Sequence, residues 1–137
     1  MEKNLFRGKS IYDGRWHEGN LLVFPSGRTK ILKWNQADLD FDQIEVDPET
    51  VGQYTGEVDK NGKKIFEWDI VDASNEWWDA AGYGGHSSSI ILVEWCRQEC
   101  GFAPFSTYDS DCGVFINAYN CEVIGNIYDN PEIKWCK

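Results

Sequence analysis

The most informative stretch of the sequence is Tyr54-Thr-Gly-Glu-Val-Asp-Lys-Asn-Gly-Lys-Lys-Ile-Phe-Glu-Trp-Asp-Ile-Val71. Its centre, Asp59-Lys-Asn-Gly62, predicts a tight turn, because Asn and Gly tolerate the positive φ angles that hairpin turns require. Four apolar residues with high strand propensity follow the turn: Ile65, Phe66, Ile70 and Val71. The stretch therefore predicts a β-hairpin that leads into a buried strand.

Short apolar runs separated by turn residues continue on both sides of this hairpin, and no long stretch keeps a helical period of 3.6 residues. The predicted strands lie at 21–24, 30–34, 42–46, 89–95, 101–106 and 121–128, and the first two flank a turn at 25–27. A short helix near 38–41 or 49–52 is also compatible with the sequence. This pattern predicts an all-β (mainly β) fold.

The order Asp-Ile-Val, a loop, Val-Glu-Trp and then Gly-Phe is typical of small SH3-like barrels. We therefore expect a single domain over 1–137 that contains a partly open SH3-like barrel. In this interpretation, 1–52 form an N-terminal β extension, 53–128 the barrel-like core and 129–137 a C-terminal tail. The core should include inward-facing residues from this set: Ile70, Val71, Ile91, Val93, Phe102, Val123 and Ile124.

The hairpin stretch resembles the YopX family of phage and prophage proteins. Further similar segments follow in the expected order: 6–11 with Gly14, Trp16 and Gly19, then 47–54, 93–95, 101–102 and 122–133. Trp68 stands where relatives usually carry a glycine, whose backbone takes dihedral angles that are costly for Trp. The resemblance implies a mainly β fold, a phage or prophage origin and compatibility with homo-oligomeric assembly, but no particular chemistry.

Composition limits the class of function. The 137 residues carry 23 acidic and 13 basic side chains, a net charge of −10, which repels phosphate backbones. A nucleic-acid partner is therefore not expected, whereas a basic protein partner or mimicry of DNA is compatible with the charge. The sequence has neither an apolar run long enough to cross a bilayer nor the apolar centre of a signal peptide, so we expect a cytoplasmic protein.

Two patterns could indicate a metal site. Residues 38–49 place Asp38, Asp40, Asp42 and Glu49 at calcium-loop positions, but Gln43 occupies the position that requires glycine. We interpret this segment as an acidic, solvated edge. The five cysteines are Cys96, Cys100, Cys112, Cys121 and Cys136, and they form no Cys-x-x-Cys pair. We therefore predict no metal and no cofactor.

The sequence offers little support for catalysis. His17 and His86 are the two histidines, and neither lies in a hydrolase or metalloprotease motif. The nearby acids Asp109 and Asp111 carry little information in so acidic a chain. A Cys–His pair assembled by the fold stays an open alternative. We expect a non-enzymatic protein with no catalytic residues.

Aromatic residues are the strongest indication of an interface. Seven Trp, six Tyr and seven Phe exceed what one small barrel usually buries. Trp77, Trp78 and Tyr83, in a Gly-rich segment expected to form a loop, are the candidate interface residues. The leading hypothesis is an accessory protein that forms homo-oligomers and binds a host or phage protein. The alternatives are a small-molecule or nucleotide-binding sponge, an uncharacterised enzyme and a virion structural component.

Overall fold

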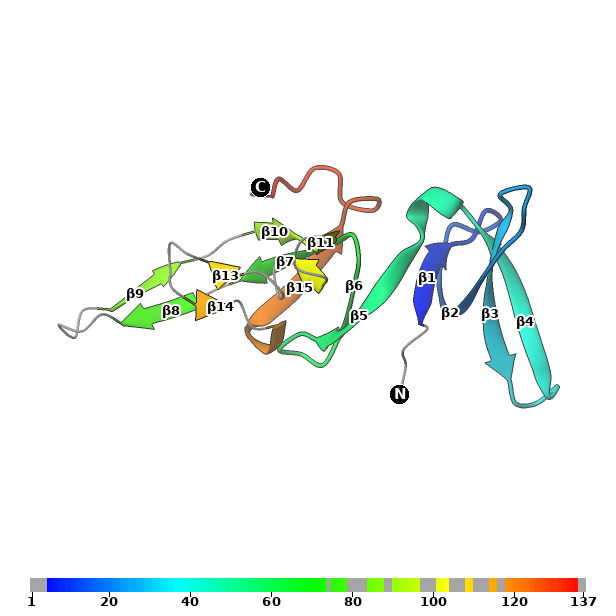
Figure 1. Ribbon diagram of the computed structural model, residues 1–137, viewed down its shortest axis with the longest axis horizontal. Helices are drawn as coiled ribbons and strands as arrows, with labels where there is room; N and C mark the ends of the chain where they lie inside the picture. Colours follow the sequence, from blue (N-terminus) through cyan, green and yellow to red (C-terminus); the bar gives the residue numbers. More distant parts are fainter. Residues whose placement is uncertain are drawn as a thin grey trace. The chain divides into compact units, whose positions relative to one another are not determined.

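The computed structural model describes residues 5–73, 75–78, 84–87, 90–96, 101–103, 108–109, 114–115 and 118–135. In these residues the regular structure consists of β-strands and two short 3-10 turns, with no α-helix (Figure 1). The strand pairs are antiparallel, and the described strands form no closed barrel. The predicted mainly β fold is therefore confirmed. The chain forms two compact units, Met1–Gly56 and Glu57–Lys137.

The first unit is formed by five neighbouring strands of a six-stranded sheet, in the order β4-β3-β2-β1-β5, and these strands pair antiparallel. Its elements are β1 (Phe6–Lys9), β2 (Trp16–Val23), β3 (Thr29–Asn35), β4 (Asp40–Val46), the 3-10 turn η1 (Pro48–Thr50) and the beginning of β5 (Gly52–Val58). The predicted hairpin around 25–27 is confirmed as β2–β3, and the predicted strand at 42–46 is part of β4.

One face of this sheet forms the core of the first unit. Ile31 and Val46 are almost completely buried, and the chain after β1 closes against the end of β4 through a bridge between Ser10 and Val46. Gly19 lies so close to Leu32 that a Cβ atom there would meet the Leu32 carbonyl. Because side chains alternate between the two faces of a strand, the opposite face of β2, β3 and β4 points away from this core.

The second unit is built around β7, which lies between β10 and β15. Three two-strand hairpins accompany this sheet: β8–β9, β11–β12 and β13–β14. The strands are β6 (Lys64–Phe66), β7 (Asp69–Ala73), β8 (Asn75–Trp78), β9 (Gly84–Ser87), β10 (Ile90–Leu92), β11 (Glu94–Cys96), β12 (Gly101–Ala103), β13 (Tyr108–Asp109), β14 (Val114–Phe115) and β15 (Cys121–Asn126), and the 3-10 turn η2 (Ala118–Asn120) precedes β15.

The predicted core of this unit is largely confirmed. Ile70, Val71 and Val93 are fully buried, and three further predicted residues pack partly buried against the same cluster: Ile91, Phe102 and Val123. Ile124 is the exception, with 37% of its surface exposed. The register of β15 against β7 shifts between Val123 and Gly125, so Ile124 lies in a bulge that turns its side chain outward.

The stretch 54–71 forms the predicted hairpin. The Asp59-Lys-Asn-Gly62 turn lies between β5 and β6, and Gly62 adopts a φ of 79°. After β6, Trp68 also has a positive φ, 74°, which is the left-handed conformation that a glycine takes without steric cost. Trp68 therefore occupies a backbone conformation that glycine adopts more readily than Trp.

Two sequence predictions need correction. The strand expected at 89–95 is divided, because Val93 bonds to the start of β7: its N–H donates to Asp69 O (2.9 Å) and its carbonyl accepts from Trp68 N (2.8 Å). As a result β10 pairs with β7, whereas β11 pairs with β12. The Gly-rich segment expected to form a loop begins with Trp77 and Trp78 in β8 and includes Gly84 and Gly85 of the paired strand β9.

Candidate protein-binding face

The side of β2, β3 and β4 that faces away from Ile31 combines apolar and charged side chains. We call it the outer face and define it by these residues: Leu22, Phe24, Arg28, Lys30, Leu32, Trp34, Phe41, Gln43 and Glu45. The strand register places them in rows, with Leu22 beside Lys30 and Lys30 beside Glu45, and with Trp34 directly opposite Phe41. Direct neighbours on one face of a sheet interact through their side chains.

The aromatic end of the outer face lies on the β3–β4 hairpin. The rings of Trp34 and Phe41 meet edge to face with their centroids 5.2 Å apart and their planes at 73°. Even so, 53% of Trp34 and 46% of Phe41 is exposed, and Leu39 in the adjoining turn is more exposed still. Exposed aromatic residues that are held in one arrangement are typical of protein-binding surfaces.

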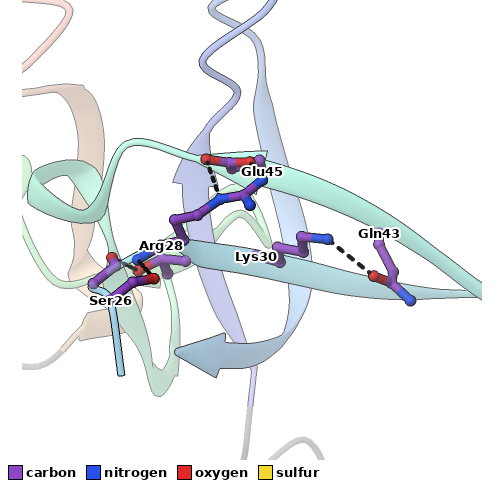
Figure 2. Close-up of polar contacts among 7 residues, drawn as sticks. Ser26, Arg28, Lys30, Gln43 and Glu45 are labelled. Carbon is purple, nitrogen blue, oxygen red and sulfur yellow. Dashed lines mark hydrogen bonds and ion pairs between the residues drawn. The ribbon is translucent and has the colours of Figure 1, made fainter. Parts of the chain in front are cut away.

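The other end of the outer face is polar and ordered by side-chain contacts (Figure 2). Arg28 donates two hydrogen bonds to the Glu45 carboxylate, of 2.6 Å from Nη2 and 3.4 Å from Nε. The hydrogen bond from Arg28 holds the pKa of Glu45 below its usual value. Lys30 Nζ donates to Gln43 Oε1 at 3.2 Å and lies 5.5 Å from the centroid of the Phe24 ring. These contacts leave the aromatic end as the more accessible apolar surface.

The edge next to the aromatic end is strongly acidic. Residues 35–49 contain six acids and no Lys or Arg: Asp38, Asp40, Asp42, Glu45, Asp47 and Glu49. Asn35 Nδ2 donates to Asp38 Oδ2 at 3.1 Å and to Asp42 Oδ1 at 3.4 Å, and Asp40 Oδ1 accepts from Phe41 N at 2.7 Å. Residues 38–49, which show the calcium-loop pattern, lie mostly in the strand β4, in agreement with the interpretation as an acidic edge.

The interface residues predicted from the sequence lie elsewhere. Trp77 and Trp78 belong to β8, where they pair with Gly85 and Gly84 of β9, and Tyr83 lies outside the described residues. The interface at these three residues stays a prediction. Sequence reasoning missed Trp34 and Phe41, although turn-forming residues at 35–38 between two aromatic residues could have indicated that they face one another across a hairpin.

The described candidates for catalysis lie on different strands. His17 lies in β2 with Nε2 4.0 Å from Asp13 Oδ1, and His86 lies in β9. Cys121 is buried, and burial, assisted by the charges of Asp72 and Asp59, raises the pKa of its thiol to about 11. A thiol with so high a pKa is a poor nucleophile at neutral pH. Within the described ranges, no three His, Cys, Asp or Glu residues are grouped to hold a metal ion.

The fold and the outer face together define a mainly β protein of antiparallel sheets that exposes an apolar surface bordered by acids. The family model described as "YopX protein" matches residues 5–133, so the chain belongs to the YopX family, as its sequence predicts. A comparison with curated proteins gives no match. The part of the chain that the structure describes contains no helix long and apolar enough to cross a membrane.

Proposed function

We propose that this YopX-family protein is a phage- or prophage-encoded accessory protein that acts in the bacterial cytoplasm by binding protein, including copies of itself, and not by catalysis. Its membership of the family supports the phage or prophage origin. The sequence supports the absence of catalysis, since it contains no recognisable catalytic motif. The finer fold prediction, a partly open SH3-like barrel within 53–128, belongs to the same proposal.

The observation that carries the proposal is the exposure of the Trp34–Phe41 pair. Each ring can bury roughly 150–250 Å², so about half of that area on each ring is left for a partner to cover. Covering it would contribute on the order of 5 kcal/mol before the cost of association. Because association costs about as much or more, the two rings act as anchors within a larger interface.

Replacing both rings tests the proposal. Trp34→Ala combined with Phe41→Ala should leave the protein folded, because half-exposed side chains contribute little to the core. It should lower the mass of the assembly in light scattering, or abolish co-purification of a protein that the unaltered chain recovers from host lysate at a fixed ratio. Truncation of an aromatic anchor commonly weakens binding by 2 kcal/mol or more, roughly 30-fold.

Two further variants make the result specific. Tyr119→Ala removes a more exposed ring from the second unit and should change neither mass nor recovery. Trp77→Ala with Trp78→Ala tests the interface predicted from the sequence. If the Trp34/Phe41 variant keeps both the mass and the co-purifying protein, the outer face is not the binding surface. If neither double variant has an effect, the binding surface lies elsewhere, and if the unaltered chain neither assembles nor recovers a protein at a fixed ratio, binding as the function is wrong.

A further inference from the structure

The edge of β4 beside the aromatic end has the geometry to accept another strand. β4 is the outermost strand of its sheet in the described structure. The Glu45 carbonyl accepts from Ile11 N at 3.1 Å, so the backbone of Glu45 is turned away from β3. Because these orientations alternate along an antiparallel strand, the backbone groups of Gln43 and Phe41 also point outward.

The protein already uses the far end of this edge for strand pairing. Ser10 bridges to Val46, and Asp47 N donates to Lys9 O at 2.9 Å. This pairing covers β4 as far as Glu45. The rest of the outer edge of β4 runs from Asp40 to Ile44 and is continuous with the paired part. The Phe41 N–H is engaged by the Asp40 carboxylate, and the Phe41 carbonyl and both backbone groups of Gln43 lie along this edge.

The two faces of this edge have different chemistry. A residue added next to Phe41 would lie on the outer face, in contact with the aromatic pair. A residue added next to Asp40 or Asp42 would lie on the opposite face, against exposed carboxylates. Since side chains of a strand alternate between faces, the complementary strand has apolar residues alternating with basic residues.

From this geometry we propose that the β3–β4 hairpin binds an extended, basic protein segment, in which apolar residues alternate with Lys or Arg, as an added strand on β4. The proposal rests on the proposed function and specifies its partner. Charge selects this occupant: a second β4 paired antiparallel around Phe41 would place Asp40 beside Asp42 of the other copy, and nucleic acid would meet the same negative surface. Acids on an edge strand discourage pairing with neutral or acidic strands, so they also favour a basic one.

The test uses fluorescently labelled ten-residue peptides and the full chain. A peptide of alternating Val and Lys should bind, with affinity that falls as salt is added. Two controls separate the contributions: alternating Val and Glu should not bind, and a peptide with five Val followed by five Lys should bind at least 10-fold more weakly. Equal binding of the alternating and the block peptide would overturn the proposal, because charge attraction alone would then explain it.

Variants of the protein test each part of the geometry. Asp40→Asn combined with Asp42→Asn should weaken binding of the Val–Lys peptide about 10-fold and reduce the salt dependence of its affinity. Phe41→Ala should weaken binding of the same peptide to a similar extent. Gln43→Pro removes an outward N–H but no bond to β3, so it should abolish binding and keep the fold. A peptide methylated on alternate backbone nitrogens tests the same pairing without altering the protein.

The failure of this inference and of the proposed function are distinguishable. Suppose that the Trp34/Phe41 variant loses its partner, whereas Gln43→Pro binds the peptide as well as the unaltered protein does and the methylated peptide binds as well as the unmethylated one. The outer face is then the binding surface, and strand addition on β4 is wrong. Loss of peptide binding in both Phe41→Ala and Gln43→Pro, with Tyr119→Ala unaffected, supports strand addition at this edge.

Discussion

The carboxylate of Asp59 accepts a hydrogen bond of 3.0 Å from the backbone N–H of Val123, 64 residues further along the chain. Its other oxygen accepts from Asn61 N and Lys63 N, each at 2.9 Å. Lys60 N donates to Cys121 O at 2.9 Å beside it. The Asp59–Gly62 turn therefore attaches the β5–β6 hairpin to β15.

This arrangement predicts an acid-sensitive contribution to stability. Burial alone would raise the pKa of Asp59, but the N–H groups of Val123, Lys63 and Asn61 together outweigh it and hold the pKa below its usual value. A carboxylate with a lowered folded pKa stabilises the protein above the unfolded value, about 4, and the contribution is lost as pH falls through the folded value.

Asp59→Asn tests this prediction, because the amide keeps only one acceptor oxygen. We expect a loss of unfolding free energy on the order of 2 kcal/mol in urea at pH 7. The difference between the variant and the unaltered protein should shrink as pH falls below 4, where the carboxylate becomes protonated. An equal difference at pH 7 and at acid pH would show that the charge of Asp59 makes no contribution.

The positive φ of Trp68 predicts that a glycine at this position gives a more stable protein than an alanine, which reverses the usual order of the two residues. Trp68→Gly and Trp68→Ala both remove the ring, but only glycine adopts the left-handed conformation without cost. The Gly variant should therefore be more stable than the Ala variant by about 1 kcal/mol in urea unfolding. At Glu67, which does not have a positive φ, the usual order with Ala more stable should hold. An Ala variant at 68 as stable as the Gly variant would contradict the backbone geometry.

The buried thiol of Cys121 should resist alkylation. Burial raises its pKa to about 11, so both access and the thiolate population are low at pH 8. Iodoacetamide treatment followed by peptide mass spectrometry should find Cys121 unmodified in the native protein and modified in urea. Labelling of the native protein at the rate of an unfolded control would show that Cys121 is accessible, contrary to its position in the core.

Local sequence predicted the features that depend on neighbouring residues. The turn at 59–62 follows from its Asn and Gly, and its hairpin is formed as expected. The hairpin at 25–27 follows in the same way from Pro25, Ser26 and Gly27. The resemblance to the family is equally local, because it rests on short segments that follow one another in a fixed order.

Features that depend on distant contacts were not predictable in this way. Nothing in the apolar run 89–95 indicates that Val93 would bond to Trp68 and Asp69 and so end one strand and begin the next. The candidate face was missed for a related reason. Trp34 and Phe41 form a pair only through the register of β3 against β4, which the turn between them sets.

Two isoleucines of the second unit, Ile70 and Ile124, differ only in their surroundings. Ile70 is fully buried in β7, whereas Ile124 lies in the bulge of β15 with 37% of its surface exposed. Both belong to the set predicted from sequence to face inward. Substitution by Ala removes the same atoms from each side chain, so the difference between the two variants measures the environment.

Ile70→Ala should lower the unfolding free energy by about 2–5 kcal/mol, since it leaves a cavity that the surrounding strands cannot fill. Ile124→Ala should cost about 1 kcal/mol or less, because solvent already reaches that side chain. Urea unfolding followed by circular dichroism measures both values, and an unchanged dependence on urea would show that the unfolded state is unaffected. Similar losses for the two variants would mean that Ile124 points into the core and that β15 has no bulge at this position.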